Sequence, residues 1–166
     1  LWLLSAGMRT PEGAKMANRV GTSGWSYDEW KGRFYPEGMA SSERLGFYAG
    51  RLGAVEVNNT FYRLPKREVL AGWAAQVPET FRFVIKASRR ITHQAKLGPD
   101  AREPLEFLTR NLAELGPRLG AVLVQTPPWL KADRGLLEAF LDWIPDGVRV
   151  AFEFRSRSWF DDDVIT

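Results

Sequence analysis

The chain has 166 residues, of which 45% are hydrophobic and 26% are charged, so it fits one ordinary folded domain and is not a disordered chain. It lacks cysteine and has a single histidine, His93, which excludes disulfides and any zinc site built from several histidines of this chain. The formal net charge of only +3 does not by itself imply a nucleic-acid partner. No apolar run approaches the roughly 20 residues of a membrane span, and we expect a cytoplasmic protein.

Residues 1–18 differ from the rest of the chain and read as a loose polar leader, disordered or foreign to the fold, with Met16 as a candidate start. We expect the folded domain to occupy residues 19–166, because regular strand and helix patterns begin at Arg19.

Five strands and four complete helices alternate along this domain. The expected strands cover residues 19–23, 54–58, 81–86, 120–125 and 149–155. The expected helices carry apolar residues at helical spacing: Leu45, Tyr48 and Leu52; Val69, Leu70, Trp73, Ala74 and Val77; Leu105, Leu108, Leu112 and Leu115; and Leu136, Leu137, Phe140, Leu141 and Ile144. Ser41 or Ser42 can cap the first helix, and Asp161, Asp162 and Asp163 are suited to the start of a fifth.

Regular alternation of strands and helices predicts a parallel α/β sheet in one domain. An open doubly wound sheet could close at five strands, whereas a (β/α)₈ barrel needs eight units and about 250 residues. Gly21 and Gly24 do not complete the glycine fingerprint of a nucleotide-binding fold, and the sequence stops where a fifth helix begins. We therefore predict a TIM-type barrel of which this chain holds about the first five βα units.

The strands are predicted to separate apolar from polar side chains. In the second strand Val55 and Val57 point to one face, and Glu56 and Asn58 to the other. The same alternation in the later strands collects six polar side chains near the carboxyl ends, where barrel active sites lie: Glu56, Asn58, Lys86, Gln125, Glu153 and Arg155. They can form a ligand pocket or a structural network, for example an ion pair between Glu56 and Lys86.

The loops that follow the strands add positive charge and aromatic rings. The basic rim consists of Arg63, Lys66, Arg67, Arg89, Arg90 and Arg157, which favours a phosphate, a sugar phosphate or a nucleic-acid backbone. Aromatic residues between Trp25 and Tyr35 can stack on bases or sugars, or plug the top of the barrel. His93, next to Thr92, can serve as a hydrogen-bonding residue or transfer protons.

Several motifs in the same order resemble those of the YecE-like family, also called domain of unknown function 72. They are Gly21-Thr22-Ser23-Gly24-Trp25-Ser26-Tyr27 with Trp30 and Phe34-Tyr35-Pro36, Glu56 to Pro65, Lys86 with Ile91-Thr92-His93, Gln125-Thr126-Pro127-Pro128, and Glu153-Phe154-Arg155 with Ser158-Trp159. The resemblance implies a TIM-type barrel and no particular activity. Members often carry His where Ser156 stands and Ser where Asn59 stands, which weakens a catalytic role for this chain.

Together these observations predict a polar pocket that binds an anionic ligand, phosphate-bearing or nucleic acid. Three residues are candidates for general acid–base catalysis: Glu56, Lys86 and Glu153. The candidate ligand-binding residues are Ser23, Trp25, Tyr27, Asn58, Thr60, Tyr62, Arg63, Thr92, His93, Gln125, Arg155 and Trp159. We expect no metal site, and the sequence identifies no cofactor. The alternatives are a non-catalytic nucleic-acid-binding module and a hydrolase with paired glutamates, as in glycosidases.

Overall fold

The computed structural model describes residues 18–161. Almost all of the expected leader lies outside these residues, as do Asp162 and Asp163 of the expected fifth helix. The short helical turn before that point covers Arg157–Phe160, and Asp161 follows it in an extended conformation.

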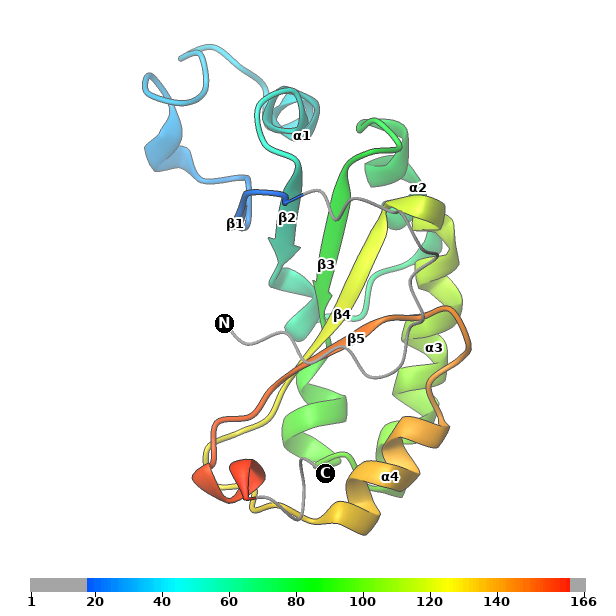
Figure 1. Cartoon of the computed structure of the whole chain (residues 1–166). Coiled ribbons are helices and arrows are strands. Elements are labelled where there is room, and N and C mark those ends of the chain that lie inside the picture. Colours follow the sequence, from blue (N-terminus) through cyan, green and yellow to red (C-terminus); the bar gives the residue numbers. More distant parts are fainter. Residues whose placement is uncertain (1–17, 162–166) are drawn as a thin grey trace.

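A parallel sheet of five strands forms the centre of the fold (Figure 1). Its strands are β1 (Gly21–Ser23), β2 (Ala54–Val57), β3 (Arg82–Lys86), β4 (Leu119–Gln125) and β5 (Val150–Glu153). They pair in the order in which they follow one another in the sequence, and every pair is parallel. The α/β class and the five predicted strands are therefore confirmed.

Four α-helices alternate with the strands: α1 (Arg44–Ala49), α2 (Arg67–Ala75), α3 (Arg102–Leu112) and α4 (Arg134–Asp142). Asp133 caps α4, because its carboxylate accepts the Leu136 N–H at 2.9 Å. The predicted serine cap of α1 is wrong. Ser41 and Ser42 lie within a 3₁₀ turn that precedes α1, and the backbone N–H of Ala40 is instead bound by the Glu43 carboxylate at 3.1 Å.

Shorter helical turns fill most of the connections. Six of them are 3₁₀ turns: η1 (Asp28–Trp30), η2 (Ser41–Glu43), η3 (Asn59–Phe61), η5 (Pro99–Ala101), η6 (Ala113–Arg118) and η7 (Arg157–Phe160). The segment η4 (Arg90–Gln94) is a π-helical turn, where the sequence predicted only a basic loop. Gly116 breaks η6 with a φ of 52°, which agrees with the predicted end of the third helix.

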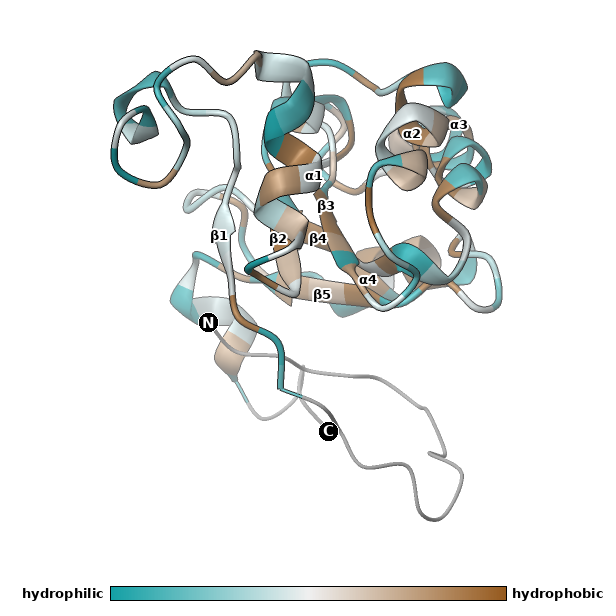
Figure 2. Cartoon of the chain, turned by 90° about the horizontal axis from the view of Figure 1, so that it is seen from above, coloured by the Kyte–Doolittle hydropathy of each residue, from teal (hydrophilic) through white to brown (hydrophobic). Residues whose placement is uncertain are grey.

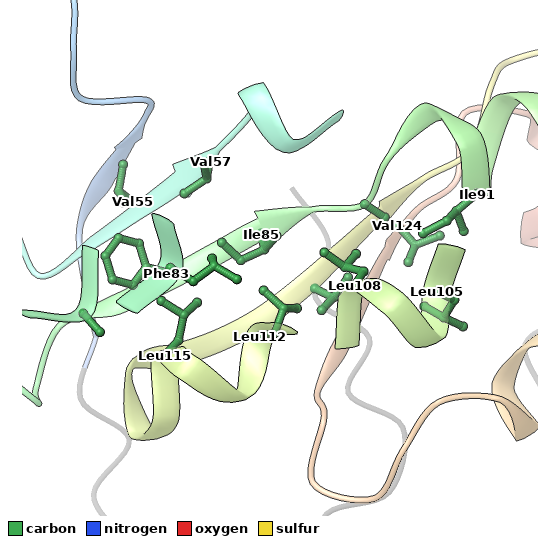
Figure 3. Packing of buried hydrophobic residues seen from close by; sticks show 14 of the residues in the cluster. Val55, Val57, Phe83, Ile85, Ile91, Leu105, Leu108, Leu112, Leu115 and Val124 are labelled. Carbon is green, nitrogen blue, oxygen red and sulfur yellow. The ribbon is translucent and has the colours of Figure 1, made fainter. Parts of the chain in front are cut away.

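The hydrophobic core lies between the sheet and the helices that cover one of its faces (Figures 1 and 3). The strands contribute Val55, Val57, Phe83, Ile85 and Val124, and the helix layer contributes Leu105, Leu108, Leu112 and Leu115. The apolar strand segments are brown in Figure 2, whereas hydrophilic teal segments are frequent in the loops and on the outer turns of α3. Each fully buried aliphatic or aromatic side chain of this kind contributes about 1.5–3 kcal/mol through removal from water.

The other face of the sheet carries the alternate residues. Val55 and Val57 are buried in the core cluster, while Glu56 between them is partly exposed, as predicted. In β3, Phe83 and Ile85 are fully buried, whereas Arg82, Val84 and Lys86 are not. The predicted alternation in these two strands is confirmed, so Glu56 and Lys86 are on the face opposite the core.

None of the helices between residues 18 and 161 has both the length and the apolar composition that a membrane span requires.

Candidate functional site

The predicted polar residues meet at the carboxyl ends of the strands. The arrowheads in Figure 1 point to this end, where the turns η4 and η7 follow β3 and β5. Parallel pairing brings all five strand ends to the same edge, so residues far apart in the sequence become neighbours there. The site consists of two hydrogen-bonded groups with a cluster of positive charges between them.

The first group joins β1 to β2. The Asn58 amide donates a short hydrogen bond to the Ser23 hydroxyl, and this hydroxyl lies 3.4 Å from Oε1 of Glu56. The Tyr27 hydroxyl donates to the Ser23 carbonyl oxygen. Four residues predicted from the sequence, Ser23, Tyr27, Glu56 and Asn58, are thus brought together.

Gly24 allows this first group to form. Its φ is +84°, and a side chain at this position would collide with the ring of Tyr27. Its N–H donates to the Glu56 carbonyl oxygen at 2.8 Å, which ties the start of the long loop to β2. The glycine therefore places Tyr27 above the end of β1.

The positive cluster is centred on Lys86, the last residue of β3. Its Nζ lies 5.4 Å from the ring centroid of Phe61, within the range of a cation–π interaction. The same ring packs edge-on against His93, with 5.0 Å between centroids. The Phe61 ring therefore contacts both the lysine and the imidazole.

The electrostatic environment of His93 includes three further positive side chains. Burial lowers the pKa of His93 below its ordinary value of 6.5, and the charges of Arg89, Lys86 and Arg155 lower it further, in that order. Its Nδ1 lies 2.8 Å from the hydroxyl of the buried Thr92, which holds the ring in place. Among the described residues, no carboxylate lies within 4.0 Å of the nitrogen atoms of Lys86, Arg89, Arg155 or His93.

The second hydrogen-bonded group joins β4 to β5. Gln125 and Glu153 are register partners, and the Gln125 amide donates to Oε1 of Glu153 at 2.7 Å. Next along the chain, the Arg155 N–H lies 3.4 Å from the hydroxyl of the buried Thr126. The glutamate is therefore fixed in orientation, and the Arg155 side chain remains exposed beside it.

Some predicted ligand-binding residues have their polar groups engaged in the fold. The Thr60 hydroxyl is buried and contacts the carbonyl oxygens of Val57 and Lys86 at 2.9 and 2.8 Å. The Trp159 indole is 1% exposed and donates to the Leu130 carbonyl oxygen at 2.9 Å. These two side chains position the strand-end loops. In contrast, Tyr62 and Arg63 are exposed after η3.

The aromatic loop is neither free for stacking along its length nor a plug over the strand ends. Trp25 packs edge-on against Trp73 of α2, with 5.4 Å between centroids, and Phe34 packs in the same manner against Phe47 and Tyr48 of α1. These contacts lie on the helix side of the sheet and extend the core. Tyr27, 40% exposed, still reaches the site.

Two arrangements considered from the sequence are not formed within the described chain. No ion pair joins Glu56 to Lys86, so a structural pair does not account for these two charges. Glu56 and Glu153 lie on strands separated by two others, a spacing of roughly 14 Å across the sheet. This spacing exceeds the range of about 5–9.5 Å for paired glycosidase carboxylates and does not support that alternative.

No group of three or more acidic, histidine or cysteine side chains suited to a metal occurs between residues 18 and 161.

Two residues of the site were not among the sequence-based candidates. Phe61 was recognised only as part of a loop motif, and Arg89 only as part of the basic rim. Spacing along the chain could have indicated Arg89, because it precedes His93 by one helical turn. The role of Phe61 depends on the contact between η3 and the π-helical turn, which no local pattern reveals.

Comparisons with known proteins identify relatives of this chain. The sequence profile of the family described as "Protein of unknown function DUF72" matches residues 19–166. UPF0759 protein YunF of Bacillus subtilis is 32% identical over 151 residues, which cover 85% of this chain and 51% of the relative. UPF0759 protein YecE of Escherichia coli K12 is 34% identical over 142 residues, with 85% and 49% covered. The chain thus spans about half the length of these relatives.

Solved structures give the same assignment. A DUF72 family protein of Thermotoga maritima superposes with a TM-score of 0.74 at 33% identity, covering 88% of this chain and 58% of that one. A DUF72 family protein of Enterococcus faecalis superposes with a TM-score of 0.72 at 25% identity, covering 89% and 54%. The profile match over nearly the whole described chain, together with these superpositions, shows that the chain belongs to the DUF72, or YecE-like, family.

Proposed function

We propose that the strand-end site binds a phosphate-bearing anion. The observation that carries this proposal is the gathering of Lys86, Arg89 and Arg155 around His93 without a carboxylate partner among the described residues. Like charges brought together repel one another, and a bound anion relieves that repulsion. Arginine guanidinium groups in addition match the oxygen geometry of phosphate.

The residues on either side suit general acid–base chemistry on such a ligand. Glu153 is held by Gln125, and Glu56 lies beside Ser23 in the group that also contains Asn58. A carboxylate at the edge of an anion site can take a proton from a hydroxyl or a water, and the neutral amides orient the substrate. Glu56 or Glu153 is the proposed base, and Lys86 is the proposed electrostatic stabiliser.

The backbone around His93 supports a functional assignment. The π-helical turn Arg90–Gln94 is followed by Lys96 and Leu97, whose φ angles of 55° and 64° are uncommon for residues other than glycine. Leu97 is nevertheless fully buried. Irregular turns of this kind are frequent at functional sites, where the surrounding structure maintains them.

We also infer that the five strands are part of a (β/α)₈ barrel. The strand order follows the sequence without the reversal that defines a doubly wound sheet, and the polar residues lie on the face opposite the helices. In a barrel this second face becomes the interior, and the strand ends become the mouth. The further strands of such a barrel would then add residues to the site.

Nucleic acid is the second candidate ligand, favoured by exposed aromatic rings in the loops after the strands. Tyr62 is 75% exposed, Trp129 54% and Phe160 51%, and Lys96 lies 5.5 Å from the ring centroid of Trp129. Exposed rings among cations are typical of surfaces on which unpaired bases stack.

One titration separates the two ligands. Inorganic phosphate and a single-stranded oligonucleotide are added to the wild-type chain and to the Lys86→Met, Arg155→Gln and Arg110→Gln variants, with binding followed by calorimetry. Loss of a charge-assisted hydrogen bond at Lys86 or Arg155 is expected to weaken phosphate binding about tenfold. Arg110→Gln, which removes an exposed charge on the outer surface of α3, is expected to have no effect.

Phosphate binding that is absent, or unchanged in Lys86→Met and Arg155→Gln, would rule out the proposed anion site. Oligonucleotide binding that falls steeply with salt, and that Trp129→Ala weakens, would favour the nucleic-acid alternative instead.

A further inference from the structure

A cavity of about 370 Å³ lies beside η3, between this turn, the segment after it and α2. It is lined by Asn59, Thr60, Arg63, Pro65, Lys66, Val69 and Trp73. The volume falls within the range of about 300–1,000 Å³ that is typical of small-molecule pockets. The cavity does not include the residues of the positive cluster around His93.

The two sides of η3 face different surroundings. The Phe61 ring contacts His93 and lies below Nζ of Lys86, at the strand ends. Asn59 and Arg63 instead line the cavity with Val69 and Trp73 of α2. The cavity is therefore a second place where a ligand can bind, and its assignment does not depend on the proposed function.

The polar lining of the cavity is cationic. Arg63 and Lys66 are exposed, and neither has a carboxylate partner within the described chain. No acidic residue lines the cavity. The neighbouring Arg67, in contrast, is paired with Glu114 and lies outside it. Two positive charges in the lining of a small cavity favour a carboxylate or phosphate group.

The apolar lining is rigid. Trp73 is held between Trp25 and Phe83, with ring centroids 5.4 and 6.1 Å away. The Pro65 carbonyl oxygen accepts the amide of the buried Asn111 at 3.0 Å. Val69 is 45% exposed although it lies on the wall next to Trp73. A preformed apolar wall next to two cations selects a ligand with an anionic head and an apolar body.

We propose that this cavity binds a small organic phosphate or carboxylate. Its anionic group lies between Arg63 and Lys66, and its apolar or aromatic part lies against Val69 and Trp73. The Asn59 side-chain amide, which has no hydrogen-bond partner within the described chain, donates to the same anionic group.

Phenyl phosphate is a suitable probe, with inorganic phosphate and phenol as its separate halves. Calorimetric titration of the Lys86→Met variant, whose strand-end site is weakened, is expected to show phenyl phosphate binding at least tenfold more tightly than either half, because the cationic and the apolar lining both contribute. The double variant Arg63→Gln/Lys66→Gln is expected to lose at least a factor of ten in affinity. Val69→Asp, which places a carboxylate in the wall, is expected to weaken binding similarly, whereas Val69→Ala weakens it less.

Two controls locate the bound probe. Arg51→Gln removes one exposed charge near α1, outside the cavity, and is expected to bind phenyl phosphate as the wild type does. Lys86 lies at the strand ends, outside the cavity. Lys86→Met is therefore expected to bind phenyl phosphate in the cavity even if the strand-end site no longer binds inorganic phosphate. Unchanged melting of each variant shows that the fold is retained.

The inference is overturned if Lys86→Met, whose strand-end site is weakened, does not bind phenyl phosphate, or binds it no more tightly than inorganic phosphate. It is also overturned if Lys86→Met abolishes binding while Arg63→Gln/Lys66→Gln preserves it, because the ligand then occupies the strand ends. If inorganic phosphate does not bind at the strand ends, only the strand-end proposal fails, because the binding of phenyl phosphate in the cavity is measured separately.

Discussion

The pKa of His93 depends on the charge of the strand-end cluster, because three cationic side chains act on its imidazole. It is the only histidine of the chain, so its ring resonances can be assigned without ambiguity. Burial and the neighbouring Arg89, Lys86 and Arg155 all disfavour the protonated ring. At neutral pH the ring is therefore predominantly uncharged and can accept or relay a proton.

The first prediction concerns the pKa of this ring. We expect NMR titration to give a His93 pKa below 6.5 in the free protein and a higher one with saturating inorganic phosphate, because the anion offsets the surrounding positive charge. Lys86→Met is expected to raise the pKa of the free protein. A pKa at or above 6.5 in the free chain, with no change on adding phosphate, would contradict the proposed cluster.

The lowered pKa of His93 also affects the free energy of unfolding. The folded-state pKa is below the unfolded value, so above pH 6.5 the ring is neutral in both states and contributes nothing. As the pH falls below that value, the unfolded chain binds a proton first and the free energy of unfolding decreases. The loss ends near the folded-state pKa. In urea unfolding between about pH 7 and about pH 5, His93→Gln should therefore lose less stability than the wild type.

At the scale of elements, the long loop after β1 depends on one buried charge. Arg44 of α1 is 2% exposed and donates to Asp28 at 2.8 Å and to Ser26 at 3.3 Å. Its guanidinium also lies 5.5 Å from the ring centroid of Tyr35. The cation thus joins both ends of the aromatic loop to α1, a role that no pattern in the sequence indicated.

Removing the carboxylate that pairs with Arg44 should loosen this loop. The hydrogen bond from Arg44, followed by the contact with Lys31, lowers the pKa of Asp28 below its ordinary value. We expect Asp28→Asn to lower the Tm at neutral pH by a few degrees, because a buried guanidinium then lacks a carboxylate partner. Glu29→Gln, next to it and exposed, is the matched control and should leave the Tm unchanged.

The difference in Tm between the wild type and Asp28→Asn should change with pH in one direction. The folded-state pKa of Asp28 is below the unfolded value of 3.8, so its contribution is complete above that value and is lost as the pH falls through the folded-state pKa. The difference in Tm between the wild type and Asp28→Asn should therefore shrink in strong acid. A difference independent of pH would contradict the role of the carboxylate charge.

In the described part of the molecule, the main hydrophobic core lies on one face of the sheet. Two neighbouring residues of β3 test this directly, because Ile85 is fully buried among the helices whereas Val84 lies on the opposite face and is partly exposed. Ile85→Ala is expected to cost about 2–5 kcal/mol of unfolding free energy. Val84→Ala is expected to cost less, about 1 kcal/mol, since part of the Val84 side chain remains in water.

Urea unfolding of the two variants gives these costs. Equal costs would show that the second face of the sheet is packed as tightly as the first. In a longer protein whose strands close a barrel, the cost of Val84→Ala should rise towards that of a buried valine, because Val84 would then lie in the barrel interior. The comparison therefore also tests the inferred barrel.

The sequence by itself determined the strands and main helices, their order and the faces of the side chains in β2 and β3. Alternation placed Glu56 and Lys86 opposite the core because successive strand residues must point to opposite faces. Glycine and proline at the element ends marked most boundaries. The π-helical turn and the missing serine cap escaped this reasoning, because both depend on hydrogen bonds that compete locally and are decided by packing.

Only the tertiary structure decided which side chains meet. The Glu153 partner is Gln125 because parallel pairing aligns those two residues. Phe61 lies next to both Lys86 and His93 because the turn after β2 contacts the end of β3 and the turn that follows it. The aromatic loop likewise packs on α1 and α2, a choice that no periodicity encodes. Local sequence patterns determine to which face of one element a side chain points. Contacts between elements depend on strand register and on the path of the loops, which only the folded chain defines.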